Sequence, residues 1–210
     1  MKKVIQGILV VVVIILGYFI YESVQKPIRF EAEQQRRYSA TIERLKDIRA
    51  AQVAYRTVHG KYTGSFDTLV NFLNTGKFKV VTMIGTIPDS LLDAGMTEKE
   101  ALKKGLIQRD TILVAVKDSL FKKPNFSLDS LSIVPFTGGK KFEMKMGEVE
   151  TGSKVKVNVF EAKVHNDVLL NGLDRQLIIN FNEYRTKVAN YPGLRVGSLD
   201  EANNNAGNWE

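Results

Sequence analysis

The chain has 210 residues, of which 44% are hydrophobic and 25% are charged, and its formal net charge is +7 at pH 7. This length and balance fit one globular domain and exclude a disordered protein, because the apolar surface is large enough to offset chain entropy. The absence of cysteine excludes disulfides, thiolate metal centres and cysteine nucleophiles. Since His59 and His165 are the only histidines, we predict that the protein is not an enzyme.

The first predicted element is an apolar run from Val4 to Tyr21 that is broken only by Gln6. A helix of about 18 residues rises about 27 Å, which is most of the thickness of a bilayer core. A cleaved signal peptide is the alternative, but the segment from Tyr18 to Gln25 lacks the paired small residues of a cleavage site. We therefore predict that residues 1–28 form an uncleaved transmembrane anchor.

The orientation of this anchor depends on the short tail ahead of it. Basic residues flank the run on both sides, so counting them does not decide which side is cytoplasmic. A short tail with Lys2 and Lys3 before a long apolar run is typical of a signal-anchor, which keeps its tail in the cytoplasm. We therefore expect residues 29–210 to form an extracytoplasmic domain.

The next segment has the pattern of an amphipathic helix. Apolar side chains recur at steps of three and four, with charged residues between them, at Tyr38, Ile42, Leu45, Ile48, Ala51, Tyr55 and Val58. Gly60 is a stop signal, and Pro27 is expected to kink a continuous helix rather than end it. This arrangement allows the anchor and the amphipathic helix to be one long element.

Two shorter helices are indicated by capping signals. Ser65 is a candidate N-cap for a helix that stops at Gly76. Thr97 and Glu100 have the spacing of a capping box, and Gly105 closes the helix that they begin. We interpret the region around 88–105 as an insertion that carries this last helix.

A period of two then predicts strands. Apolar and charged residues alternate on both sides of a turn at 151–153, which predicts a β-hairpin over residues 141–164. The alternation slips at Val159-Phe160, where we expect a bulge or a change of face. Further strands are expected at 78–84, 111–116, 131–134 and 177–181, and the apolar segment 111–116 is expected to be covered on both faces.

Several of these segments together carry a family resemblance. The apolar helix leads through Pro27 into an amphipathic stretch that finishes at Tyr55, and Gly60-Lys61-Tyr62 precedes the short helix. Near the C-terminus, Val196-Gly197-Ser198 is followed by a loop rich in Asp and Asn. In these features the chain resembles type IV pilins and, more closely, type II secretion pseudopilins.

The resemblance implies an α+β fold in which the transmembrane helix continues into a long helix packed on an antiparallel sheet. It also implies a non-enzymatic structural subunit of a cell-envelope assembly or secretion filament. Such a subunit sits in the bacterial inner membrane with its C-terminal domain in the periplasm. The expected partners are the membrane, envelope or secretion-complex proteins, and further copies of the chain.

The chain also departs from the family pattern. Pilin precursors have a Gly-Phe processing site and an early helix glutamate, whereas here Gly7 precedes Ile8 and the first acidic residue is Glu22. Tyr62 is followed by Thr63, where the family prefers proline. The alternative function is therefore a membrane-anchored periplasmic binding or accessory domain that does not polymerise. An anchored enzyme is a third class, for which the sequence shows no catalytic arrangement.

Two surface features are candidates for ligand binding. The loop near the C-terminus offers oxygen ligands, so Asp200, Glu201 and Asn205 are candidate calcium ligands. The resemblance implies the same, because the corresponding loop of the major pseudopilins is a calcium site. The alternative is a polar tail pinned by Trp209, and no other cofactor is expected. The predicted hairpin carries a basic face, but its aromatic residues fall on the apolar side, so no nucleic-acid partner is expected. This face comprises Lys140, Lys141, Lys145, Lys154 and Lys156.

Overall fold

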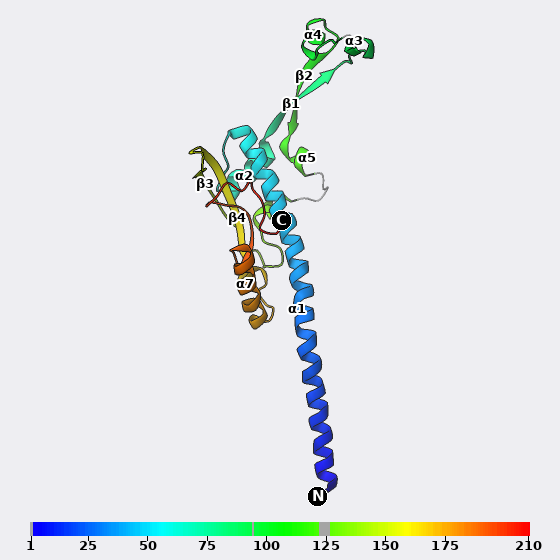
Figure 1. Cartoon of the computed structure of the whole chain (residues 1–210), viewed down its shortest axis with the longest axis vertical. Helices are drawn as coiled ribbons and strands as arrows, with labels where there is room; N and C mark the ends of the chain where they lie inside the picture. Colours follow the sequence, from blue (N-terminus) through cyan, green and yellow to red (C-terminus); the bar gives the residue numbers. More distant parts are fainter. Residues whose placement is uncertain (1, 94, 122–126) are drawn as a thin grey trace.

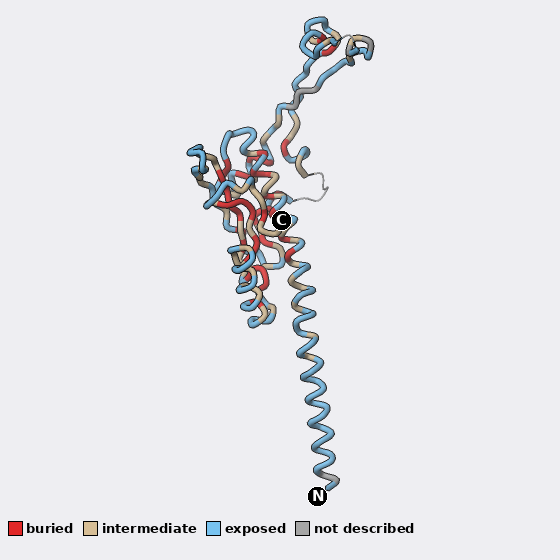
Figure 2. The backbone as a smooth tube through the Cα atoms, in the orientation of Figure 1, coloured by how far each residue is buried: buried red, intermediate tan, exposed pale blue. Residues whose placement is uncertain are grey.

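One long helix organises the molecule, which the computed structural model describes over residues 2–93, 95–121 and 127–210. Helix α1 runs from Lys2 to His59 without a break, so the anchor and the amphipathic helix form a single element (Figure 1). Pro27 lies inside this helix and does not end it. Most of the remaining chain packs around the C-terminal half of α1, while the first half stands apart and is exposed (Figure 2).

The shorter elements make two separate antiparallel sheets. Strands β3, β4 and β5 form a three-stranded sheet with β4 at its centre, and β1 and β2 form a two-stranded ribbon. The fold is therefore α+β, as predicted. In chain order the elements are α2 (Phe66–Thr75), β1 (Lys77–Ile84), α3 (Asp89–Asp93), α4 (Glu98–Lys103), β2 (Gln108–Ala115), α5 (Val116–Leu120), a 3-10 helix (Leu128–Ser132), β3 (Glu143–Glu150), β4 (Lys156–His165), α6 (Asn166–Leu169), α7 (Arg175–Ala189) and β5 (Gly193–Gly197).

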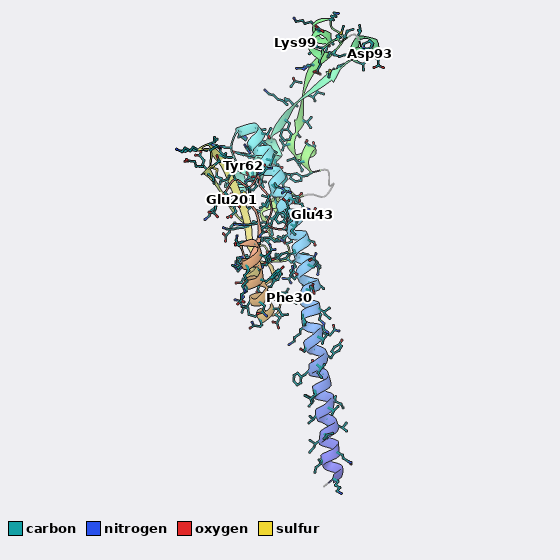
Figure 3. All side chains as sticks on the ribbon, viewed as in Figure 1. Phe30, Glu43, Tyr62, Asp93, Lys99 and Glu201 are labelled. Atoms are coloured by element: carbon teal, nitrogen blue, oxygen red, sulfur yellow. The ribbon has the colours of Figure 1, made fainter. Side chains whose placement is uncertain are left out.

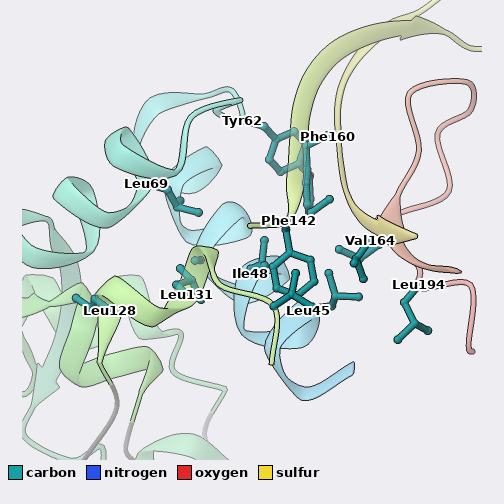
Figure 4. Packing of buried hydrophobic residues seen from close by; sticks show 14 of the residues in the cluster. Leu45, Ile48, Tyr62, Leu69, Leu128, Leu131, Phe142, Phe160, Val164 and Leu194 are labelled. Atoms are coloured by element: carbon teal, nitrogen blue, oxygen red, sulfur yellow. The ribbon is translucent and has the colours of Figure 1, made fainter. Parts of the chain in front are cut away.

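The hydrophobic core lies between α1 and the three-stranded sheet. Leu45, Ile48 and Ala51 project from α1 and are fully buried. They form one cluster with side chains from the sheet and the segment before it, among them Phe142, Phe160, Ala162, Val164, Leu194 and Val196 (Figure 4). The prediction of a helix packed on a sheet is confirmed, although Val58, at the end of the helix, is 46% exposed. We call the packed residues, 30–76, 116–121 and 127–210, the head.

The predicted hairpin is confirmed, but the predicted bulge or change of face at Val159-Phe160 is wrong. β3 and β4 pair without interruption from Glu143 opposite Lys163 to Glu150 opposite Lys156. The apparent slip arises because residues 159–162 are all buried, as the centre strand of a sheet covered on both sides requires. On the outer face, Glu161 is buried and forms ion pairs with Lys163 Nζ at 2.6 Å and with an Arg195 nitrogen at 3.7 Å.

Two other predicted strands are wrong. Residues 177–181 belong to helix α7, which begins where Asp174 Oδ1 accepts hydrogen bonds from the backbone nitrogens of Gln176 and Leu177. A helix places Ile178 and Phe181 on the same face, toward the core, and Ile178 is buried. Residues 131–134 lie in and after the 3-10 helix and form a single bridge, from Ile133 to Lys141.

The ribbon of β1 and β2 forms an arm that extends away from the head, and α3 and α4 lie at its far end (Figure 1). The predicted strands at 78–84 and 111–116 correspond to β1 and β2, and the capping box of Thr97 and Glu100 is present in α4. The expectation that 111–116 is covered on both faces is wrong, because Leu113 is 56% exposed. Each strand of a two-stranded ribbon has a single neighbour, and no helix in the described part of the chain covers these exposed side chains.

A buried polar contact joins α1 to the start of α6. Tyr38 Oη donates a hydrogen bond to Asn166 Oδ1, and both residues are buried. The burial raises the pKa of Tyr38 to about 12, because the phenolate would lose its hydration. The Tyr38 ring also packs edge-on against Phe181 of α7, with 5.6 Å between the ring centroids.

We expect Tyr38→Phe to lower the free energy of unfolding at pH 7 by about 1–3 kcal/mol, because the buried Asn166 oxygen loses its donor. The folded-state pKa is above the ordinary value of 10, so the contribution of Tyr38 is complete below pH 10 and declines as the pH rises toward 12. The difference in unfolding free energy between the two proteins should therefore become smaller between pH 10 and pH 12. Urea unfolding at pH 8 and pH 11 measures it, and a difference that stays constant would contradict the prediction. Burial also raises the pKa of Tyr191, which is present in both proteins, and the charge of a Tyr38 phenolate raises it further in the unmodified protein.

Candidate functional site

The first candidate site is the exposed apolar half of α1. Its large apolar side chains from Ile5 to Ile20 are each at least 46% exposed, and none contacts the head core. This is one helix long and apolar enough to cross a membrane, and it lies near the N-terminus. Gln6 is the one polar amide within the run. Such a surface is compatible with lipid or with other apolar helices, and not with water.

The head is fixed to α1 just beyond this surface. Arg37 donates hydrogen bonds from one guanidinium nitrogen to the carbonyl oxygens of Leu169 and Asn171, each at 3.0 Å. Its Nε donates to Glu33 Oε1 at 2.9 Å, and this bond holds the pKa of the Glu33 carboxyl below its ordinary value. Phe30 packs edge-on against Phe181, with 6.4 Å between centroids. These contacts hold the lower part of the head against the helix (Figure 3).

The candidate calcium ligands lie in the loop after β5, but the structure does not bring them together as a cation cage. Asp200 and Glu201 are exposed, and their backbone nitrogens both donate to Ser198 Oγ. Asn205 Nδ2 donates to Tyr62 Oη at 2.9 Å, and the Asn205 carbonyl oxygen accepts from Arg49 at 3.4 Å. Among the described residues, no three His, Asp or Glu side chains could share a metal ion. Calcium binding by this loop stays a prediction.

The C-terminal end of this loop is held by several contacts. An Arg49 guanidinium nitrogen lies 2.7 Å from Glu210 Oε1, and this hydrogen bond holds the pKa of the Glu210 carboxyl below its ordinary value. Asn208 exchanges hydrogen bonds with the backbone of Arg195 in β5. Trp209 is half-buried and packs against the core cluster. The last residues therefore connect α1, through Arg49, to β5, through Arg195.

The expected basic face of the hairpin is not a single face. Lys145 of β3 lies opposite Glu161, on the outer side of the sheet. Lys156 of β4 is an odd number of residues from Glu161 and therefore lies on the opposite side. The expectation of one basic face is wrong because the register of the two strands places Lys145 and Lys156 on opposite sides of the sheet.

Both histidines make structural contacts and do not meet at a common site. The His59 ring packs against Tyr55 at 4.4 Å and Phe72 at 5.4 Å between ring centroids. His165 Nδ1 accepts a hydrogen bond from the backbone nitrogen of Asp167 and caps α6.

No protein-family model, no curated protein and no solved structure matches this chain. Two features of the surface were not among the candidate sites named from the sequence: the exposed arm and the start of α7, which approaches α1 near the end of its apolar run. A local signal for the second was present, because Asp174 has the spacing of an N-cap before Gln176 and Leu177. The approach of α7 to α1 depends on tertiary packing and has no local signal.

Proposed function

We propose that the protein is a non-enzymatic, membrane-anchored structural subunit of a cell-envelope assembly or secretion filament. The observation that carries the proposal is the unbroken helix α1, which joins an exposed apolar half to a half that is buried in the head. Because the connection is helical, no loop separates the head from the apolar segment. In this proposal the chain resides in the bacterial inner membrane with its head in the periplasm.

The shape of α1 supports assembly through the apolar half. In a single subunit, lipid would cover these apolar side chains. In a bundle, neighbouring helices would cover them, and close packing would drive the association. The amide of Gln6 adds a side chain that can hydrogen-bond across two helices. Contacts through the arm would add to this association, since it presents exposed apolar residues such as Ile84 and Leu113.

A second candidate function is an anchored accessory domain that does not polymerise. The observation in its favour is that the apolar run contains no carboxylate, since Glu22 is the first acidic residue of the chain. A buried carboxylate that pairs with a neighbouring amino terminus sets the register of helices in low-dielectric surroundings. Without it, Lys2 and Lys3 would meet like charges of a neighbour in the same register.

Cysteine cross-linking in membranes tests the proposal, and the chain has no native cysteine to interfere. Leu9 and Leu16 are two turns apart on one face of α1, so we expect Leu9→Cys and Leu16→Cys together to give ladders of more than two subunits. The control is Lys154→Cys, in the turn after β3 and far from the bilayer segment. Products no larger than dimers would contradict the filament subunit and support the accessory domain.

A further inference from the structure

A wedge-shaped cavity separates the start of α7 from the membrane-proximal part of α1. It measures about 400 Å³ and is lined by Phe19, Glu22, Ser23 and Lys26 of α1 together with Asp174 and Leu177 at the start of α7. We call it the α1–α7 wedge. Above it, the contact between Phe30 and Phe181 joins the two helices. The first turn of α7 points toward the N-terminal half of α1 (Figure 1).

The wedge lies at the edge of the apolar run. The run ends at Tyr21, so Phe19 is within it and Lys26 follows it by about 8 Å along the helix axis. The polar headgroup layer of one leaflet is about 5–7 Å thick. With the apolar run inside the bilayer core, the wedge therefore spans the acyl boundary at Phe19 and the outer headgroup level at Lys26.

The charged side chains of the wedge are available to a ligand. Glu22 and Lys26 are four residues apart on α1, and among the described residues neither forms an ion pair. The Asp174 carboxylate, in contrast, already accepts two backbone hydrogen bonds. The wedge thus offers one ammonium and one carboxylate side by side. Phe19 and Leu177 add apolar surface from the two helices.

We propose that the α1–α7 wedge binds a zwitterionic aminophospholipid of the leaflet nearest the head. Lys26 pairs with the lipid phosphate, Glu22 pairs with the headgroup ammonium, and Phe19 and Leu177 contact the glycerol and upper acyl region. The proposal rests on the proposed membrane anchoring of α1. Its consequence is that the head stands directly on the bilayer surface with a lipid between its two helices.

Photo-cross-linking of the full-length protein in vesicles tests this assignment. The vesicles contain equal amounts of phosphatidylethanolamine and phosphatidylglycerol, and a photoreactive benzoylphenylalanine replaces Leu177. Intact mass then identifies the lipid that is attached. We expect phospholipid adducts at this position, with phosphatidylethanolamine enriched about threefold over phosphatidylglycerol, because only its headgroup carries both charges.

Two further positions serve as controls. The same group at Ile14, in the middle of the apolar run, should form adducts with both lipids equally, and at Leu113 in the arm it should form none. Adducts at Ile14 without adducts at Leu177 would overturn the proposed lipid binding in the wedge, but not the proposed anchoring. No adduct at Ile14 would overturn the anchoring itself, and with it the wedge. Equal labelling by both lipids at Leu177, or enrichment of phosphatidylglycerol, would overturn the choice of headgroup.

A matched pair of lysine variants tests the role of Lys26. Lys26→Gln should lower the yield of the phosphatidylethanolamine adduct at Leu177 about fivefold, the effect of one basic residue near a phospholipid surface. Lys46→Gln is the control, because Lys46 lies on the same helix but beside the head, where it pairs with Glu43. Equal yields from the two variants would overturn the assignment of Lys26 to the phosphate.

Discussion

Replacing Gly197 by alanine is expected to destabilise the head by about 3–5 kcal/mol, which is a large part of the roughly 5–15 kcal/mol by which a folded domain is stable. Gly197 has a φ of +72°, a conformation that alanine adopts only with strain. An added Cβ would also lie 2.0 Å from the carbonyl oxygen of Phe160. That oxygen belongs to the backbone of β4, so relief of the clash requires β5 to move away from the centre of the sheet.

Urea unfolding followed by fluorescence measures this effect, because Trp209 is the single tryptophan and packs next to the core. Gly152→Ala is the matched control. Gly152 lies in the turn between β3 and β4, and an added Cβ there has no heavy atom within 4 Å. The control should change the unfolding free energy by less than about 0.5 kcal/mol. Similar stability of the two variants would show that β4 and β5 are not as close as described.

Deletion of residues 2–28 is expected to move the protein almost completely from the membrane fraction to the soluble fraction. The deleted segment contains the whole apolar run, whose burial in lipid supplies the binding free energy. Because the large apolar side chains from Ile5 to Ile20 are exposed, their removal takes away no core contact. The urea midpoint of the head, read from Trp209, should therefore stay close to that of the full chain.

A second truncation provides the control for this experiment. Residues 85–107 at the end of the arm can be replaced by Asn-Gly, a two-residue turn that suits the register of Ile84 opposite Gln108. This variant should remain in the membrane fraction, because α1 is untouched. Retention of the first variant in membranes would mean that the head binds the bilayer without the apolar run, and would contradict the proposed anchor.

Local signals in the sequence predicted the elements whose ends they define. Ser65 caps α2 and Thr97 with Glu100 forms the capping box of α4, because a cap depends on atoms within one turn. The α1 stripe was also predictable, since a period near 3.6 directs one face toward a core. That the first half of α1 is long and apolar enough to cross a membrane follows from length and composition alone.

The wrong predictions concern segments whose structure depends on tertiary packing rather than on local sequence. The segment 177–181 is short, apolar and rich in branched residues, and such runs fit a strand as well as a buried helix. β4 is buried on both faces, so its burial does not alternate and was mistaken for a bulge. The exposure of Leu113 in the arm depends on which elements fold back over it. The α1–α7 wedge depends on the separation of two helices that are more than a hundred residues apart in the chain.

Pro27 gives α1 a preferred bending point. Proline has no backbone N–H, so the carbonyl oxygen of Ser23, four residues earlier, lacks its helical donor at this step. The step lies between the end of the apolar run and Phe30, the first contact with the head. A force that pulls the head sideways is therefore taken up first as a bend of α1 at this step. In the proposed membrane arrangement, this bend lets the head change its angle to the bilayer while the sheet and its core keep their packing.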